Sequence, residues 1–187
     1  MKNLLEFLNA VHPLSPDLKE HLSGILKVNE LPRKSYFLRQ GHICRYIAFV
    51  EKGLLRCYYE KDEKEVCSWF MKEGDVIISV ESFFKQTISY ENIQALEDCT
   101  LYYINFNELQ YIYQHFPEFN FTGRVLAENY YALSEQRLYS IRMQRGKERY
   151  DYLIDKFPEL IRRVPSKYLA SYLGISEFTL SRIRSRK

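Results

Sequence analysis

The hydrophobic periodicity of the chain changes twice, and this change constrains the fold more than any other feature. Between residues 30 and 104, short runs of β-branched and aromatic residues are separated by glycines and charged turns. Many short runs at fairly even spacing predict an antiparallel β sandwich or barrel. On both sides of this region, apolar residues recur at helical spacing. We therefore expect an α+β chain in which helices flank a β-rich body.

The β-rich region contains eight runs that we expect to form strands. A chain of 187 residues that is 46% hydrophobic can bury a core around them, which excludes intrinsic disorder. The expected strands cover residues 36–38, 46–50, 54–59, 66–70, 76–78, 88–90, 93–96 and 101–104.

Helices are predicted before and after this region. A helix over residues 15–27 begins with Ser-Pro-Asp, a capping residue followed by proline. Asn107 is expected to cap a short helix that ends before Phe116, and a longer helix should run from Pro117 past Ile141. A further helix is expected over residues 147–157.

Three apolar residues of the long helix lie seven positions apart. Phe119, Leu126 and Leu133 have the spacing of a coiled-coil seam between two copies of the chain. The same spacing is equally compatible with packing against the β-rich body.

The segment over residues 166–184 predicts two short helices joined by a tight turn. Gly174 supplies the positive φ that such a turn demands, and Ser176 can cap the second helix. This pattern is typical of a helix-turn-helix whose second helix, over residues 176–186, enters the major groove of DNA. The predicted DNA-binding residues are Lys167, Ser176, Glu177, Phe178, Thr179, Ser181, Arg182 and Arg184.

Charge is unevenly distributed along the chain. The formal net charge is +3, but residues 160–187 hold seven basic residues and one acidic residue. The tail therefore carries +6 and the remainder −3. A basic terminal segment favours a polyanionic partner, double-stranded DNA in this case. The alternative is a helical hairpin with a solvated basic end.

With these features, the sequence resembles the Crp/Fnr family of bacterial transcription regulators over nearly its full length. The matching residues are the turn glycines Gly41, Gly53 and Gly74, the Gly74-Asp75 pair, the long helix from Pro117, and the motif over residues 169–176. The resemblance implies a cyclic-nucleotide-binding-type jelly roll over residues 1–116, a dimerisation helix over 117–145 and a DNA-binding domain over 146–187. It also implies a homodimer on a palindromic operator, with RNA polymerase as a further partner.

The sequence departs from the members of this family that bind cyclic AMP. Their Gly-Glu pair, which holds the ribose, is replaced by Ile78-Ser79, and their Arg-Ser pair, which holds the phosphate, by Ser89-Tyr90. A cyclic phosphate without a guanidinium partner loses its main charge-assisted contact, and Lys85 is a weak substitute. We therefore expect an effector other than cyclic AMP, or none.

Alignment with the family places the remaining effector pocket near six residues. An occluded, vestigial pocket is the equally plausible alternative. The six residues are Ser79, Ser89, Tyr90, Gln94, Ser134 and Glu135.

The cysteines and histidines predict no metal site and no cofactor. Their spacing matches neither an iron–sulfur nor a zinc pattern, and nothing marks His42 or His115 as a haem ligand. Cys57 and Cys67 flank a turn and could form a redox switch, although ordinary strand cysteines are the favoured interpretation. An enzyme of the cupin type would need clustered His and Glu ligands, so we expect a non-enzyme.

Two further expectations concern location and the chain end. The N-terminus lacks a signal-peptide pattern and no apolar run approaches a membrane span, which predicts a cytoplasmic protein without a membrane partner. Family members commonly carry a β-hairpin wing after the recognition helix, which this sequence lacks, so that helix would carry most of the DNA contact. A ligand-binding module that no longer binds DNA is the alternative function.

Overall fold

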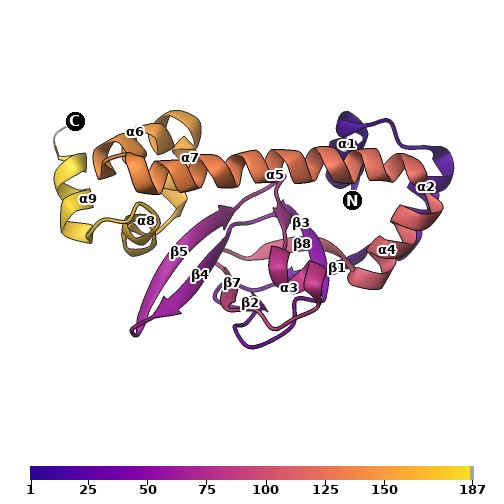
Figure 1. Cartoon of the computed structure of the whole chain (residues 1–187), viewed down its shortest axis with the longest axis horizontal. Helices are drawn as coiled ribbons and strands as arrows, with labels where there is room; N and C mark the ends of the chain where they lie inside the picture. The colour runs from indigo at the N-terminus through magenta and orange to yellow at the C-terminus, as the bar shows by residue number, and fades with distance from the viewer. Residues whose placement is uncertain (186–187) are drawn as a thin grey trace. The chain divides into compact units, whose positions relative to one another are not determined.

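The structure is a computed structural model that describes residues 1–185 as nine helices and eight strands (Figure 1). Their order along the chain is α1 (Lys2–Val11), α2 (Pro16–Ile25), β1 (Lys27–Leu31), β2 (Tyr36–Leu38), β3 (Tyr46–Lys52), β4 (Leu55–Lys61), β5 (Lys64–Met71), β6 (Val76–Ile77), α3 (Val80–Lys85), β7 (Glu91–Ala95), β8 (Cys99–Asn105), α4 (Phe106–His115), α5 (Pro117–Met143), α6 (Gly146–Lys156), α7 (Pro158–Arg163), α8 (Ser166–Tyr172) and α9 (Glu177–Arg184).

The strands form two four-stranded sheets, with the orders β1-β8-β3-β6 and β2-β7-β4-β5. In the first sheet β8 pairs antiparallel with both β1 and β3, so that Tyr103 lies opposite Lys27 on one side and Ala48 on the other. Val50 and Leu101 are fully buried in this sheet. The predicted antiparallel β-rich region is therefore confirmed.

Two strand predictions need correction. Residues 88–90 do not form a strand, because Ile88 makes only an isolated bridge with Ile43. The strand β1 was not predicted, because its sequence, Lys-Val-Asn-Glu-Leu, buries only its last residue and shows little apolar alternation. An edge strand of this kind is specified by its pairing with β8.

The helix before α5 is capped by Asn105 and not by the predicted Asn107. The Asn105 side chain accepts from the backbone N–H of Glu108 at 2.9 Å, and the Glu108 carboxylate accepts from the backbone N–H of Asn105 at 2.7 Å. This reciprocal pair is a capping box. The long helix agrees with its prediction and spans 27 residues from Pro117 to Met143.

The chain divides into two compact units. The first contains residues 1–57 and 70–127, and the second contains residues 58–69 and 128–187. The second unit thus combines the tip of the β4–β5 hairpin with the later half of α5 and with α6–α9. The predicted boundaries at residues 116 and 145 stay a prediction. Among the described residues, no helix is long and apolar enough to cross a membrane.

Candidate nucleic-acid interface and ligand site

The helices α8 and α9 are joined by a turn whose geometry follows from two residues. Gly174 has φ +61°, and its N–H donates to the carbonyl of Ser171 at 3.0 Å. Ser176 caps α9, because its Oγ accepts from the backbone N–H of Thr179 at 3.1 Å. Leu169 of α8 and Leu180 of α9 are buried. One face of α9 is thereby fixed outward.

That outward face carries four of the predicted DNA-binding residues. Glu177, Phe178, Ser181 and Arg182 are exposed, and Phe178 is 75% exposed. Within residues 1–185 the guanidinium of Arg182 has no hydrogen-bond or ion-pair partner, so its donors remain available. An exposed phenylalanine beside a free arginine is a surface suited to apolar and charged contacts at once.

The other predicted DNA-binding residues already have partners in the protein. Arg184 donates from Nε to the Tyr150 hydroxyl at 3.3 Å and from Nη1 to Ser166 Oγ at 2.9 Å. Lys167 Nζ lies 4.0 Å from a carboxylate oxygen of Glu65. The Ser176 and Thr179 hydroxyls lie 2.9 Å apart. Arg186 and Lys187, which the sequence includes in the basic tail, lie outside the described residues.

Two arginines that sequence reasoning missed hold the end of α8. Arg149, which is buried, donates from Nε to the Leu173 carbonyl at 2.8 Å and from Nη1 to the Gln144 carbonyl. Arg137 donates to the Tyr172 carbonyl and stacks over the Tyr172 ring at 3.7 Å. Both arginines thus satisfy carbonyls that the end of a helix leaves without an intrahelical partner. Their sequence context is ordinary, so no motif marks them.

Burial and the neighbouring Arg149 both act on the pKa of Arg137. Burial lowers the pKa of the Arg137 guanidinium, and the positive charge of Arg149 lowers it further, although the group stays charged at neutral pH. We refer to Arg137 and Arg149 with the carbonyls of Tyr172 and Leu173 as the arginine clamp. The clamp fixes the turn from which α9 begins.

The same unit contains a contact between α8 and the β4–β5 hairpin. The Ser171 hydroxyl accepts from the backbone N–H of Cys67 at 2.9 Å and donates to the carbonyl of Glu65 at 2.9 Å. The Ser171 side chain thus bonds to backbone groups of β5, as a neighbouring strand would. The sequence places Ser171 in the helix-turn-helix motif but gives no sign of this second role.

The predicted dimer-helix residues occupy different environments on α5. Phe119 is buried and its ring lies 5.7 Å from that of Tyr113. Leu126 is half-buried and Leu133 is exposed. Further large apolar side chains that the heptad count missed are exposed on the later part of the helix: Tyr131, Leu138, Tyr139, Ile141 and Met143.

Four of the six predicted effector residues lie in the first unit, and the structure brings two of them together. Ser79 and Ser89 are buried, and their hydroxyl oxygens lie 3.2 Å apart. Tyr90 is exposed and its hydroxyl donates to Glu81 at 2.9 Å. Ser134 and Glu135 are exposed on α5 in the second unit, so their place in a pocket stays a prediction.

Gln94, the remaining predicted effector residue, is bonded to a buried arginine. Arg56 is only 1% exposed, and its Nε donates to Gln94 Oε1 at 3.0 Å and its Nη2 to the same oxygen at 2.6 Å. Sequence reasoning passed over Arg56 because it stands within an apolar run that is buried on both faces. The guanidinium is thus already engaged with a neutral amide.

The cysteines are free thiols and all four are buried. Burial raises the pKa of the Cys99 thiol to about 11 and also raises that of Cys44, so both stay protonated at neutral pH. The Cys57 thiol donates to the Glu91 carboxylate at 2.7 Å. Across the described part of the chain, no three His, Cys, Asp or Glu side chains are grouped to hold a metal ion.

Comparisons with known proteins agree with this architecture. Residues 28–116 match the cyclic nucleotide-binding domain family. A search of curated protein sequences finds no significant match. Among solved structures, the chain is similar to the c-di-GMP-responsive global regulator CLP of Xanthomonas campestris, with 16% identity, a TM-score of 0.71, and coverage of 90% of this chain and 89% of that one.

Two other similar structures are also regulators. The catabolite activator protein of Thermus thermophilus has 17% identity and a TM-score of 0.59, over 96% of this chain and 85% of that one. A transcriptional regulator of the Crp/Fnr family from Eubacterium rectale has 17% identity and a TM-score of 0.67, over 95% and 85%. At these identities the likeness establishes the fold, which is the one that the sequence resemblance implied.

Proposed function

We propose that this chain, which contains a cyclic nucleotide-binding domain and has the fold of the Crp/Fnr regulators, is a transcription regulator that binds DNA sequence-specifically as a homodimer. The observation that carries the proposal is the outward face of α9. There Arg182 has no partner within residues 1–185, Phe178 is 75% exposed, and the arginine clamp holds the turn that orients the helix.

The chemistry of this face suits base readout in the major groove. The free guanidinium of Arg182 can donate both of its hydrogen bonds to guanine O6 and N7, the commonest specific contact. Glu177 can accept from cytosine N4, and Phe178 can contact a thymine methyl group. All three side chains are exposed on one short helix, as a reading surface requires.

Phosphate contacts are assigned to the hydroxyl and basic residues around this face. Ser176, Thr179 and Ser181 lie at or within the first turns of α9, where backbone N–H groups also favour anions. Arg184 and Lys167 can reach phosphates if they exchange their present partners, Ser166 and Glu65, for DNA. Phosphate contacts of this kind fix the register on the duplex but carry no sequence preference.

A single recognition helix reads only a few base pairs, so a homodimer on two half-sites is part of the proposal. The exposed apolar residues of α5, including Leu133 and Leu138, favour this helix as the dimer interface. An exposed helix with several large apolar side chains gains free energy by burying them against a second copy.

The proposed effector is not cyclic AMP. Ser79 and Ser89 are hydrogen-bonded to each other, and the only buried arginine of the described sheets, Arg56, is bonded to Gln94. Accommodating a cyclic phosphate would require breaking these bonds before forming new ones. The proposal therefore includes another effector, or none.

The test begins with selection of bound duplexes from a random library at a fixed salt concentration. With the selected duplex, Arg182→Ala should weaken binding by about 1–3 kcal/mol and relax the sequence preference. Arg184→Ala should weaken selected and random duplexes alike and reduce the salt slope by about one. Arg33→Ala, which removes an exposed arginine of the first unit, is the charge-matched control and should change little.

Failure to select any duplex would contradict the proposal. If Arg182→Ala lowers the affinity for selected and random duplexes by the same factor, Arg182 does not read bases.

The dimer is tested by sedimentation velocity. Leu138→Glu places a charge at an exposed apolar position of α5 and should raise the dimer dissociation constant at least about tenfold, because an unpaired charge opposes burial. Gln136→Glu, at an exposed polar position two residues away, is the matched control. Identical sedimentation of both variants and the unmodified chain would exclude this face of α5 from the interface.

A further inference from the structure

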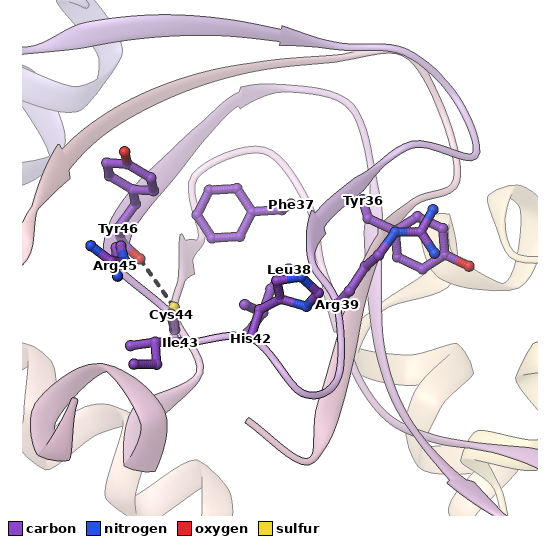
Figure 2. Close-up of a pocket in the computed structure, with 9 residues that line it drawn as sticks. All are labelled: Tyr36, Phe37, Leu38, Arg39, His42, Ile43, Cys44, Arg45 and Tyr46. Carbon is purple, nitrogen blue, oxygen red and sulfur yellow. Dashed lines mark hydrogen bonds between the residues drawn. The ribbon is translucent and has the colours of Figure 1, made fainter. Parts of the chain in front are cut away.

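The first unit has a cavity of about 240 Å³ that does not involve the predicted effector residues (Figure 2). It is lined by β2, by the loop that follows and by the start of β3, and its side chains include Phe37, Arg39, His42, Arg45 and Tyr46. Figure 2 places Arg45 beside Tyr46 on one side and Arg39 beside Tyr36 on the other, with His42 between them. The cavity is therefore built from one short stretch of chain.

The backbone of this loop is held by hydrogen bonds to neighbouring segments, and the His42 ring nitrogen Nδ1 also lies 3.4 Å from the Gln40 carbonyl oxygen. The N–H of Gly41 donates to the carbonyl of Ser89 at 2.8 Å, and the N–H of Ser89 donates to the carbonyl of His42 at 2.9 Å. The N–H of Cys44 donates to Ser82 Oγ at 2.9 Å. Because the backbone is already fixed, a ligand would not have to order it.

The cavity is lined by three basic side chains and by the hydroxyls of two tyrosines, Tyr36 and Tyr46. Arg39, His42 and Arg45 are exposed, and no acidic side chain is among the described residues that line the cavity. Within residues 1–185 the Arg45 guanidinium has no hydrogen-bond or ion-pair partner. The Arg39 guanidinium stacks over the Tyr36 ring at 3.8 Å and has no hydrogen-bond acceptor among the described residues. The free donors of these two arginines are therefore suited to an anionic ligand.

Aromatic rings stand beside these donors. Phe37 is half-buried, and Tyr46 is 42% exposed and makes an edge contact with Tyr103 at 5.1 Å. An aromatic ring that is supported on one side offers its remaining surface to a planar ligand group. Sites for small molecules commonly combine such apolar walls with a few polar groups.

We propose that this cavity binds a small organic anion, with its carboxylate or phosphate held by Arg45 and His42 and its ring packed against Phe37 and Tyr46. The volume of about 240 Å³ corresponds to about eight waters at roughly 30 Å³ each, so the site suits a small ligand such as a single ring with its anionic group. The proposal does not depend on DNA binding. Its loop is bonded to Ser82 and Ser89, so a bound ligand also stabilises the segment that carries α3.

The experiment is an NMR titration of the full-length, ¹⁵N-labelled chain without DNA. The probes are phenyl phosphate, benzoate, inorganic phosphate and benzyl alcohol. Saturable shifts are expected at the amides of residues 36–46 and at Nε of Arg45 with at least one of the two aromatic anions. Whichever of these two binds more tightly shows whether the site prefers a phosphate or a carboxylate. Inorganic phosphate should bind more weakly, and benzyl alcohol should produce no saturable shift.

Two variants distinguish a site from general charge attraction. Arg45→Gln should weaken the better aromatic anion about tenfold, since it removes a charge-assisted contact. Arg33→Gln removes another exposed arginine of the same unit and should leave binding unchanged. Both substitutions change exposed side chains, and the unperturbed part of each spectrum verifies the fold.

The proposal is overturned if neither aromatic anion gives saturable shifts, if the shifts spread over exposed arginines in general, or if Arg45→Gln binds as tightly as Arg33→Gln. Since DNA is absent, a chain that fails to bind DNA can still pass this test, and a chain that binds DNA can fail it.

Discussion

Gly53 connects β3 and β4 in a conformation that other residues rarely adopt. Its φ is +103°, and a Cβ at this position would lie 2.5 Å from Cys99 Sγ and 2.8 Å from the Asp98 carbonyl oxygen. Gly53→Ala should therefore destabilise the chain by at least about 2 kcal/mol, through both the backbone strain and the clash. Urea unfolding measures this loss.

Gly24 provides the control for that substitution. It lies in α2, and a Cβ there would have no atom within 4 Å. Gly24→Ala should stabilise the chain by about 0.5–1 kcal/mol, because alanine is the better helix former. If both alanine variants unfold at the same urea concentration, the close approach of Cys99 to Gly53 is not a constraint on the fold.

Individual residues also differ in how far their structural role can be predicted from the sequence. Ser176 was identified as a cap because a serine before a helical pattern has one obvious use. The partner of Arg56 was not predictable in this way, because the Gln94 amide to which it donates lies 38 residues away. A local pattern contains no information about a partner of that kind.

At the scale of elements, the arginine clamp yields a test of how α9 is oriented. Arg149→Lys keeps the positive charge, but an ammonium group cannot reproduce the hydrogen bonds to the Leu173 and Gln144 carbonyls. Affinity for the selected duplex should fall about tenfold, while affinity for random duplexes and the salt slope stay unchanged. Competition binding at several salt concentrations measures all three quantities.

Arg142→Lys is the matched control, since Arg142 is exposed on α5 in the same unit. Arg149 acts here as a positioning residue and not as a DNA contact. Equal losses on both kinds of duplex would contradict this role and indicate a general loss of the folded unit.

The elements themselves were largely predictable where the chain carries a cap or a regular apolar period. The long helix α5 and the pair α8 and α9 follow such patterns. The start of α4 was misplaced by two residues, because Asn105 and Asn107 are both good caps and only Asn105 has Glu108 three positions later.

For the whole molecule, Ser171 links the β4–β5 hairpin to α8 within the second unit. Ser171→Ala leaves the Cys67 N–H and the Glu65 carbonyl without this partner. The loss should cost about 1–3 kcal/mol locally, and hydrogen exchange at the Cys67 amide should accelerate at least about fivefold. Exchange measured by mass spectrometry on peptides covering residues 58–69 reports this change.

Ser134→Ala is the control, because in the described part of the chain the Ser134 hydroxyl bonds only to the carbonyl of Tyr130 in its own helix. If Ser171→Ala and Ser134→Ala give the same exchange over residues 58–69, the hairpin is held by other contacts. If only Ser171→Ala accelerates exchange, the hairpin and α8 are mechanically joined, and both belong to one unit that can respond together.

Four features could be predicted from the amino-acid sequence: the antiparallel β-rich region, the long helix, the helical pair with its turn at Gly174, and the outward face of α9. Each of these depends on contacts between residues that are near neighbours or on a period that a single element repeats. The partners of Arg56, Arg149 and Ser171 and the basic cavity around Arg45 became apparent only in the folded chain. These features join segments that are distant in the chain or depend on which side chains are left without partners after folding, and neither property can be read from local pattern.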